Sequence, residues 1–92
     1  MAVEVRIPTI LRTFTGGAKA VQGEGETLQQ VIDNLDERHP GLKDRLIDPN
    51  GLRRFVNVYV NDEDVRFLGG LGAETSDGDV VVVLPAVAGG AG

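Results

Sequence analysis

A single amphipathic helix is the feature of this sequence that most constrains its fold. Its apolar residues recur at the spacing of one helix face: Leu28, Val31, Ile32 and Leu35. Thr27 precedes this stripe and Gln30 follows three residues later, which is the capping-box pattern of a helix start. The residues 39–41, His-Pro-Gly, end the helix, and residues 42–47 are expected to add a further helical turn. One stripe needs one apolar surface to bury against, so the rest of the chain must supply a sheet.

The remaining pattern is that of strands. Apolar and polar residues alternate from Val3 to Ile7, and residues 18–21 are expected to return as the second strand of a hairpin. Strand character resumes over residues 55–60, and residues 65–67 are expected to form a short return strand. Residues 80–84 are an unbroken apolar run, typical of a central strand or one buried on both faces.

Pro85 cannot donate to a strand ladder and should mark the end of the sheet. The order β-β-α-β-β-β predicts an α+β protein with a β-grasp (ubiquitin-like) fold. We expect a mixed sheet of four to five strands on one main helix, with residues 1–85 as the domain. Residues 86–92 are expected to form a flexible C-terminal tail that contains Gly-Gly.

Composition excludes several classes of function. The chain has 92 residues, no cysteine and one histidine, which leaves no side-chain thiol chemistry and no cluster that needs two histidines. Its formal net charge is -5, so neither a nucleic acid nor a membrane is expected as a partner. No secretory leader is visible and no apolar run could span a bilayer. We expect a cytoplasmic monomer that is a binding or carrier module.

Most candidate chemical groups have a plain structural interpretation. Residues 62–64 are acidic, as are Asp77 and Asp79 on either side of Gly78, but each cluster lies in a predicted turn, where aspartate is favoured. His39, at a helix end, is expected to be structural. Arg53 and Arg54 form a basic patch that suits an acidic protein partner, or they are simply a solvated strand end.

Two aromatic residues are candidates for a docking surface. Phe55 and Tyr59 alternate with the valines of the same predicted strand and should point away from the helix. An exposed aromatic there would anchor a protein partner, unless loops of the chain cover that face.

The C-terminal tail carries the most specific signal. After Pro85 it has no charge and no large side chain, and it reads Ala86, Val87, Ala88, Gly89, Gly90, Ala91 and Gly92. Glycine at two successive positions lets a chain enter a narrow channel and bring a main-chain carbonyl into another protein's active site. The alternative is a frayed terminus.

Three segments resemble a known family. Residues 7–12 (IPTILR), 54–66 (RFVNVYVNDEDVR) and 77–90, which end in LPAVAGG, resemble the ubiquitin-like sulfur carriers of the ThiS/MoaD family. The resemblance spans nearly the whole chain. It is most pronounced to the actinobacterial branch that serves cysteine biosynthesis.

The resemblance implies a protein cosubstrate rather than an enzyme. In that family an E1-like (MoeB/ThiF-type) adenylyltransferase uses ATP and magnesium to adenylate the terminal carboxylate, here that of Gly90, and sulfur then replaces AMP to give a thiocarboxylate. No cofactor or metal is expected on the carrier itself. The implied acceptor is a pyridoxal-phosphate cysteine synthase, or a thiosugar, molybdopterin or thiamin synthase, and residues 85–90 would contact these partners.

The sequence departs from this family after Gly90, because family members usually end at Gly-Gly. We expect a precursor from which a metal-dependent (JAMM-type) protease removes Ala91 and Gly92. The alternatives are direct activation at Gly92 and a dipeptide that is an artefact. A second class of function fits the same tail, namely a ubiquitin-like modifier that is conjugated through Gly90 to lysines of target proteins.

Overall fold

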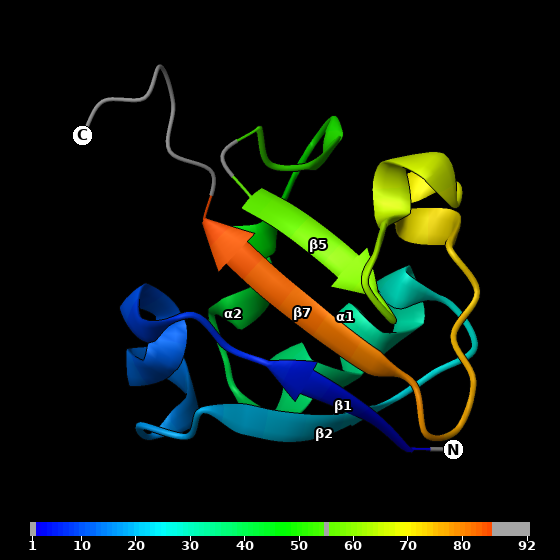
Figure 1. Cartoon of the computed structure of the whole chain (residues 1–92). Helices are drawn as coiled ribbons and strands as arrows, with labels where there is room; N and C mark the ends of the chain where they lie inside the picture. The colour runs from blue at the N-terminus through cyan, green and yellow to red at the C-terminus, as the bar shows by residue number, and fades with distance from the viewer. Residues whose placement is uncertain (1, 55, 86–92) are drawn as a thin grey trace.

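The fold is a mixed sheet packed on one main helix, seen in a computed structural model that describes residues 2–54 and 56–85 (Figure 1). The five strands lie in the order β2 (Ala20–Glu24), β1 (Ala2–Arg6), β7 (Val80–Pro85), β5 (Val56–Val60) and β6 (Glu63–Asp64). The α-helices are α1 (Leu28–Arg38) and α2 (Leu42–Leu46). Three 3-10 helices lie in connections between strands: η1 (Thr9–Thr15), η2 (Val65–Phe67) and η3 (Gly70–Gly72). A small separate hairpin consists of β3 (Ile47–Asp48) and β4 (Gly51–Leu52).

Strand pairing confirms the predicted β-grasp. β1 pairs antiparallel with β2, with Val5 opposite Val21, and parallel with β7, with Val5 opposite Val81. On its other side β7 pairs antiparallel with β5, where Val58 lies opposite Val83. β7, the last strand in the sequence, is therefore the central strand of the sheet, as its unbroken apolar run predicted.

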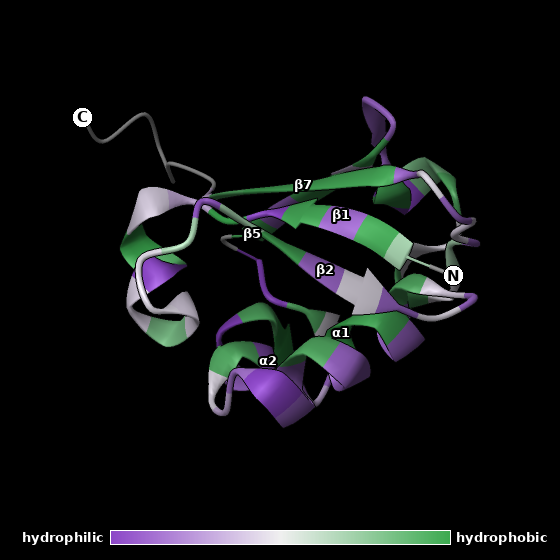
Figure 2. Cartoon of the chain, turned by 90° about the horizontal axis from the view of Figure 1, so that it is seen from below, coloured by the Kyte–Doolittle hydropathy of each residue, from purple (hydrophilic) through white to green (hydrophobic). Residues whose placement is uncertain are grey.

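The core lies between one face of the sheet and α1 (Figure 2). All four residues of the predicted helix stripe are buried, as are alternate residues of the three central strands: Val3, Val5, Val58, Val60, Val81 and Val83. The opposite face of β7 is only half-buried at Val80 and Val82, so this strand is buried on one face and not on both. None of the helices in the described residues is long and apolar enough to cross a membrane.

Two predicted details were wrong. Residues 65–67 form the 3-10 helix η2 instead of a strand, because the Asp64 side chain accepts a hydrogen bond from the Arg66 backbone N–H at 2.9 Å and caps a helical turn. The return strand is instead the two-residue β6. The second strand of the first hairpin begins at Ala20 and continues to Glu24, later than residues 18–21.

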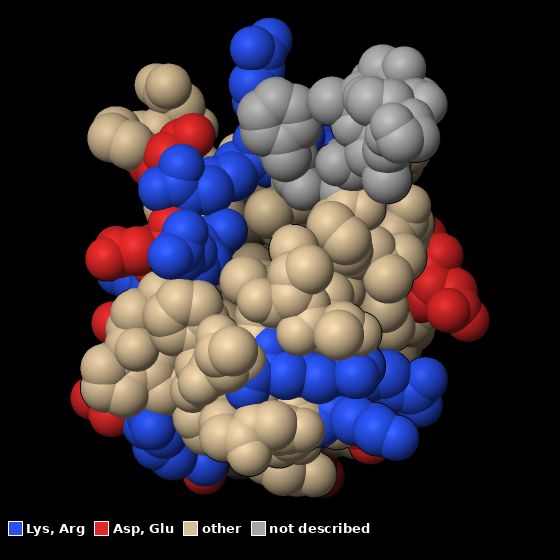
Figure 3. Space-filling model, turned by 90° about the vertical axis from the view of Figure 1, so that its left-hand side faces the viewer, with Lys and Arg blue, Asp and Glu red and all other residues tan. Residues whose placement is uncertain are grey.

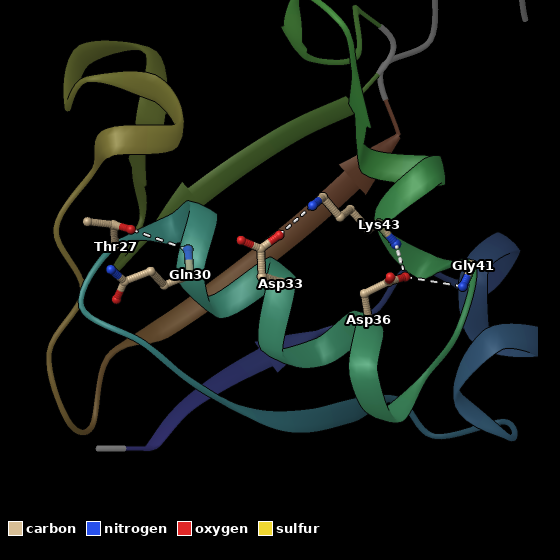
Figure 4. A network of polar contacts seen from close by, with 6 residues as sticks. All are labelled: Thr27, Gln30, Asp33, Asp36, Gly41 and Lys43. Atoms are coloured by element: carbon tan, nitrogen blue, oxygen red, sulfur yellow. Dashed lines mark hydrogen bonds and ion pairs between the residues drawn. The ribbon is translucent and has the colours of Figure 1, made fainter.

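The start of α1 follows the predicted cap with one change. Thr27 accepts a hydrogen bond from the backbone N–H of Gln30 at 3.3 Å (Figure 4). The Gln30 side chain turns back, as in a capping box, but it accepts from the backbone N–H of Glu26 at 2.8 Å instead of that of Thr27. Both bonds satisfy backbone donors that have no partner within the helix.

Asp36 links the two helices. Its Oδ1 accepts hydrogen bonds from the backbone N–H groups of Gly41 and Lys43, each at 3.1 Å, and so caps the start of α2 (Figure 4). Nearby, Lys43 Nζ lies 2.6 Å from Asp33 Oδ1. The hydrogen bond and charge of Asp33 raise the pKa of Lys43 above its ordinary 10.5. The pair therefore contributes at neutral pH and is lost in alkali above that value, and its exposure makes the contribution small.

Two glycines allow β2 and the following loop to lie directly on α1. A Cβ at Gly23 would come within 2.9 Å of a Val31 side-chain methyl group. A Cβ at Gly25 would lie 2.7 Å from the Val31 backbone nitrogen, which cannot move without distorting the first turn of the helix. Glycine at position 25 is therefore required by close backbone contact.

Replacing Gly25 with alanine tests this contact. We expect Gly25→Ala to lower the free energy of unfolding by about 1–3 kcal/mol, the range typical of overpacking. Urea denaturation followed by circular dichroism measures the change. Gly72→Ala is the matched control, because Gly72 has no atom within 4 Å of the added Cβ and should shift the stability by less than about 0.5 kcal/mol. Equal stability of the two variants would contradict the proposed contact.

Comparison of two aspartates on the same helix tests the cap of α2. Asp36→Ala removes a carboxylate that accepts two backbone hydrogen bonds, whereas Asp33→Ala removes one that pairs only with an exposed lysine. We expect Asp36→Ala to be less stable than Asp33→Ala by about 1 kcal/mol in the same denaturation experiment. If Asp33→Ala were the less stable variant, the surface pair and not the cap would be the main link between α1 and α2.

Candidate functional site

The candidate site is built around the end of β7. This strand is held on both sides, by β1 and by β5, and its last residue, Pro85, lies opposite Val56. Leu84 is 45% exposed and Pro85 is exposed, so the strand leaves the core before the sheet ends. The chain continues from there into residues 86–92, which means that the predicted reactive tail starts from the central strand of the sheet.

Tyr59 lies on the outer face of the sheet, as predicted. Its neighbours in the strand, Val58 and Val60, are buried against the helix, whereas Tyr59 is half-buried. It pairs with Val82 of β7 and forms with Val82, Leu84 and Asp62 a shallow hollow of about 240 Å³. An apolar surface that carries one aromatic ring thus extends along the outer face toward the end of β7.

A second hollow, of about 430 Å³, lies on the other side of the β7 end. Figure 3 shows the left-hand side of the molecule as drawn in Figure 1, where several Lys and Arg side chains lie among uncharged residues. The apolar wall of this hollow comes from residues that are far apart in the sequence: Pro8, Ile10, Leu11, Val56, Val83, Leu84 and Pro85. Its polar rim comes from α2, β3 and the segment before β5: Asp44, Arg45, Asp48, Arg53 and Arg54. We call this the tail-side hollow, because Pro85 is part of its wall.

Ile10 is the residue of this hollow that sequence reasoning missed. It lies in η1 and is 68% exposed, although its neighbour Leu11 is buried in the core. Ile10 continues the apolar wall that includes Leu84 and Pro85, and a contiguous exposed apolar surface is a signal for contact with another molecule. The sequence could not assign it, because a strand or turn at residues 9–15 would have placed different residues outside.

The acidic candidates Asp77 and Asp79 make structural hydrogen bonds, as predicted. Asp77 accepts a hydrogen bond from the Ala2 backbone N–H at 2.9 Å. Asp79 accepts from the Asn61 side chain at 2.9 Å and from the Ser76 backbone N–H at 2.8 Å. His39 caps the end of α1, and its backbone N–H donates to Leu35 O at 2.7 Å. Across residues 2–54 and 56–85 no group of three His, Asp or Glu residues is placed to hold a metal ion.

Several predicted site residues lie outside the described residues and stay predictions. They are Phe55, Ala86, Val87, Ala88, Gly89, Gly90, Ala91 and Gly92. Of the predicted partner-binding residues, the structure therefore places Tyr59 and Pro85. Both lie on exposed parts of the sheet, and Leu84, which belongs to both hollows, lies between them.

Comparison with known proteins identifies the family. The ThiS family model matches residues 5–90, nearly the whole chain. The sulfur carrier protein CysO of Mycobacterium tuberculosis is 57% identical, over 98% of this chain and 100% of that protein. The small archaeal modifier protein 3 of Haloferax volcanii is 39% identical, over 98% of this chain and its own full length.

A solved structure agrees with this assignment. A chain of the crystal structure of the Amycolatopsis orientalis BexX/CysO complex is 61% identical and superposes with a TM-score of 0.92, over 97% of this chain and 100% of that one. The relatives named CysO are sulfur carriers and not enzymes. With its ubiquitin-like fold, its size and the match from residue 5 to Gly90, the chain belongs to the ThiS family and is a small sulfur carrier rather than an enzyme.

Proposed function

We propose that this carrier holds sulfur as a thiocarboxylate at Gly90 and delivers it to a biosynthetic enzyme. The observation that carries the proposal is the ThiS match, which runs through Gly89 and ends at Gly90. Cysteine synthesis is the favoured pathway, supported by the 57% identity to mycobacterial CysO. Thiosugar, molybdopterin and thiamin synthesis are the other pathways of this class.

The proposed chemistry takes place on the main chain. A carboxylate oxygen of Gly90 attacks the α-phosphorus of ATP within an E1-like adenylating enzyme, and pyrophosphate leaves. Sulfide then attacks the carbonyl carbon of the acyl-adenylate, and AMP leaves with the electrons of the broken bond. A persulfide donor would attack the same carbon to give an acyl disulfide, which a reductant then cleaves to the thiocarboxylate. The adenylating enzyme binds the ATP and magnesium, and this chain supplies the carboxylate. The resulting sulfur is a better nucleophile than the oxygen it replaces.

Three kinds of partner follow from this proposal. They are an E1-like (MoeB/ThiF-type) adenylyltransferase, a sulfur-accepting synthase such as a pyridoxal-phosphate cysteine synthase, and a JAMM-type metal-dependent protease. The crystal complex of the Amycolatopsis relative supports partner proteins for the carrier in general. We further propose a cytoplasmic location, where ATP is available to the adenylating partner.

Ala91 and Gly92 require a processing step in this scheme. A peptide bond occupies the Gly90 carbonyl in the full chain, so no carboxylate exists there for ATP to activate. We propose that the metal-dependent protease removes this dipeptide.

A second function is favoured by one observation, the 39% identity to an archaeal small modifier protein. A modifier uses the same adenylate but transfers the Gly90 carbonyl to a lysine amine of a target protein. The two functions differ in the species that accumulates, a free thiocarboxylate in the first case and a protein conjugate in the second.

The precursor proposal predicts different behaviour of two chains. Incubated with the adenylating enzyme, ATP, magnesium and sulfide, the chain ending at Gly90 is expected to exchange one oxygen for sulfur. The full chain is expected to remain unchanged until the protease is added, and a metal chelator should block that rescue. Intact mass spectrometry measures both. Equal conversion of the two chains without protease would contradict the need for processing.

The same reaction in a cell lysate separates carrier from modifier. Arg66 is the last tryptic site before the tail, so a conjugate would carry residues 67–90 as a branch on a target lysine. The carrier function predicts the thiocarboxylate without such branched peptides. Abundant branched peptides without thiocarboxylate would favour the modifier.

The outer sheet face is proposed to dock on the adenylating enzyme. Tyr59→Ala is expected to weaken binding about tenfold, because truncating a half-buried aromatic anchor commonly costs more than 1 kcal/mol. Phe55→Ala is expected to act in the same direction. Phe67→Ala is the matched control, because Phe67 is 83% exposed and lines neither hollow. Titration calorimetry gives the affinities and circular dichroism checks the fold; unchanged affinity of both Tyr59→Ala and Phe55→Ala would overturn this surface.

A further inference from the structure

Two hollows adjoin each other beside the end of β7. The tail-side hollow has the apolar wall described above, with Ile10 exposed in it. The second hollow, which we call the arginine hollow, lies between the β3–β4 hairpin and η3 and is lined by Arg53, Arg54 and Arg66. Arg53, Arg54 and Val56 belong to both hollows, so the two form one continuous surface.

Charge distinguishes this surface from the rest of the chain. The protein has a formal net charge of -5, yet no aspartate or glutamate is among the described residues that line the arginine hollow. The ion pairs found within residues 2–54 and 56–85 are Arg6–Glu4 and Lys43–Asp33, and neither involves these arginines. Within the described residues, these arginines therefore form no ion pair, and the carboxylates of the surface, Asp44 and Asp48, line the tail-side hollow and not the arginine hollow.

Contacts other than ion pairs hold the arginines of this surface. Arg53 Nε donates to the Asp44 backbone oxygen at 2.7 Å, and Arg66 donates to the Asn57 side-chain oxygen. Arg45, on the rim of the tail-side hollow, lies with its guanidinium carbon 5.4 Å from the centre of the Phe14 ring. A guanidinium has five N–H donors, so a single bond to a neutral oxygen leaves donors for a carboxylate.

The carboxylates of the tail-side hollow lie on one side of it. Asp44 and Asp48 come from α2 and β3, and Asp48 accepts a hydrogen bond from the Asn50 backbone N–H at 2.8 Å. These two carboxylates would repel an acidic partner on their side of the tail-side hollow. The positive charge is therefore concentrated toward the arginine hollow, and the apolar contact toward Ile10 and Leu84.

We infer that this surface is a docking site for an acidic patch of the adenylating partner. The partner would place an apolar side chain in the tail-side hollow, against Ile10, and carboxylates beside it at Arg54 and Arg66. Charge complementarity specifies the acidic patch, because an acidic carrier would otherwise repel it. This inference rests on the proposed function for the choice of partner.

The position of Pro85 connects docking with chemistry. Pro85 belongs to the wall of the tail-side hollow, so a protein seated there contacts the residue from which the tail begins. An enzyme that activates a terminal carboxylate must hold both the body of the carrier and its tail. Binding at this surface would hold the start of the tail in a defined position relative to that enzyme.

Charge reversal at single positions tests the inference. We expect Arg54→Glu and Arg66→Glu each to raise the dissociation constant for the purified adenylating enzyme about fivefold at low salt, and less at high salt. Arg38→Glu makes the same charge change on the exposed end of α1, outside both hollows, and should leave the constant within about twofold. Arg54→Lys keeps the charge and should bind nearly as the original chain does. Ile10→Ser should weaken binding at both salt concentrations.

Binding measured without ATP separates this inference from the proposed function. The test uses the chain ending at Gly90 and its variants. If this chain binds but forms no thiocarboxylate when ATP and sulfide are added, the proposed function fails and the docking site stands. If thiocarboxylate forms while Arg54→Glu, Arg66→Glu and Ile10→Ser all bind as Arg38→Glu does, the docking site is overturned and the function stands. Absence of binding by the chain ending at Gly90 would overturn both. Circular dichroism of each variant excludes loss of fold as the cause.

Discussion

Packing of one helix stripe on one sheet face is the interaction on which the rest of this structure depends. The stripe of α1 meets alternate valines of β1, β5 and β7, and these contacts form a single core. The sheet and α1 approach each other so closely that the positions facing the helix must be glycine, at Gly23 and Gly25. In a domain of this size no second core would compensate for separation of the two layers. The identity of two small residues, Gly23 in β2 and Gly25 in the loop that follows it, therefore determines how closely the sheet can approach the helix.

The position of β7 follows from the same packing and has a functional consequence. β7 pairs with β1 as far as Val82 and with β5 as far as Pro85, and it buries Val81 and Val83, so its end is held relative to the whole domain. A tail that begins at Pro85 therefore starts from a rigid base. For a carrier this matters, since a partner can locate the tail only through the body of the protein. Two surfaces meet at that base, the outer face around Tyr59 and the tail-side hollow, and Leu84 belongs to both.

The sequence predicts the fold well wherever a periodic pattern repeats. The α1 stripe and the apolar β7 run each repeat over at least five residues, and their burial is as expected except on the outer face of β7. The short segment at residues 65–67 was predicted wrongly because a single hydrogen bond, accepted by the Asp64 side chain, decides its conformation. Three residues are also too few to show the periodicity of a helix or a strand.

The candidate site is predicted only in part, for a different physical reason. Tyr59 could be assigned from alternation within one strand. The tail-side hollow could not, because it joins η1, α2 and the end of β7, and no local pattern records which distant segments become neighbours. Ile10 becomes a candidate only once the helical turn at residues 9–15 is known. The basic patch at Arg53 and Arg54 was visible in the sequence, but its continuation to Arg66 depends on the fold.

The choice of basic residues fits the proposed chemistry. An acyl-adenylate reacts with any thiol or unprotonated amine that reaches it, and this chain has no cysteine and only Lys19 and Lys43 as lysines. Lys43 pairs with Asp33 at 2.6 Å, and this hydrogen bond and charge raise the pKa of Lys43, which lowers the fraction of unprotonated amine further. Beside the end of β7, the positive charge comes instead from arginines such as Arg53. Arginine thus attracts an acidic partner to the base of the tail without placing a reactive amine next to the activated carbonyl.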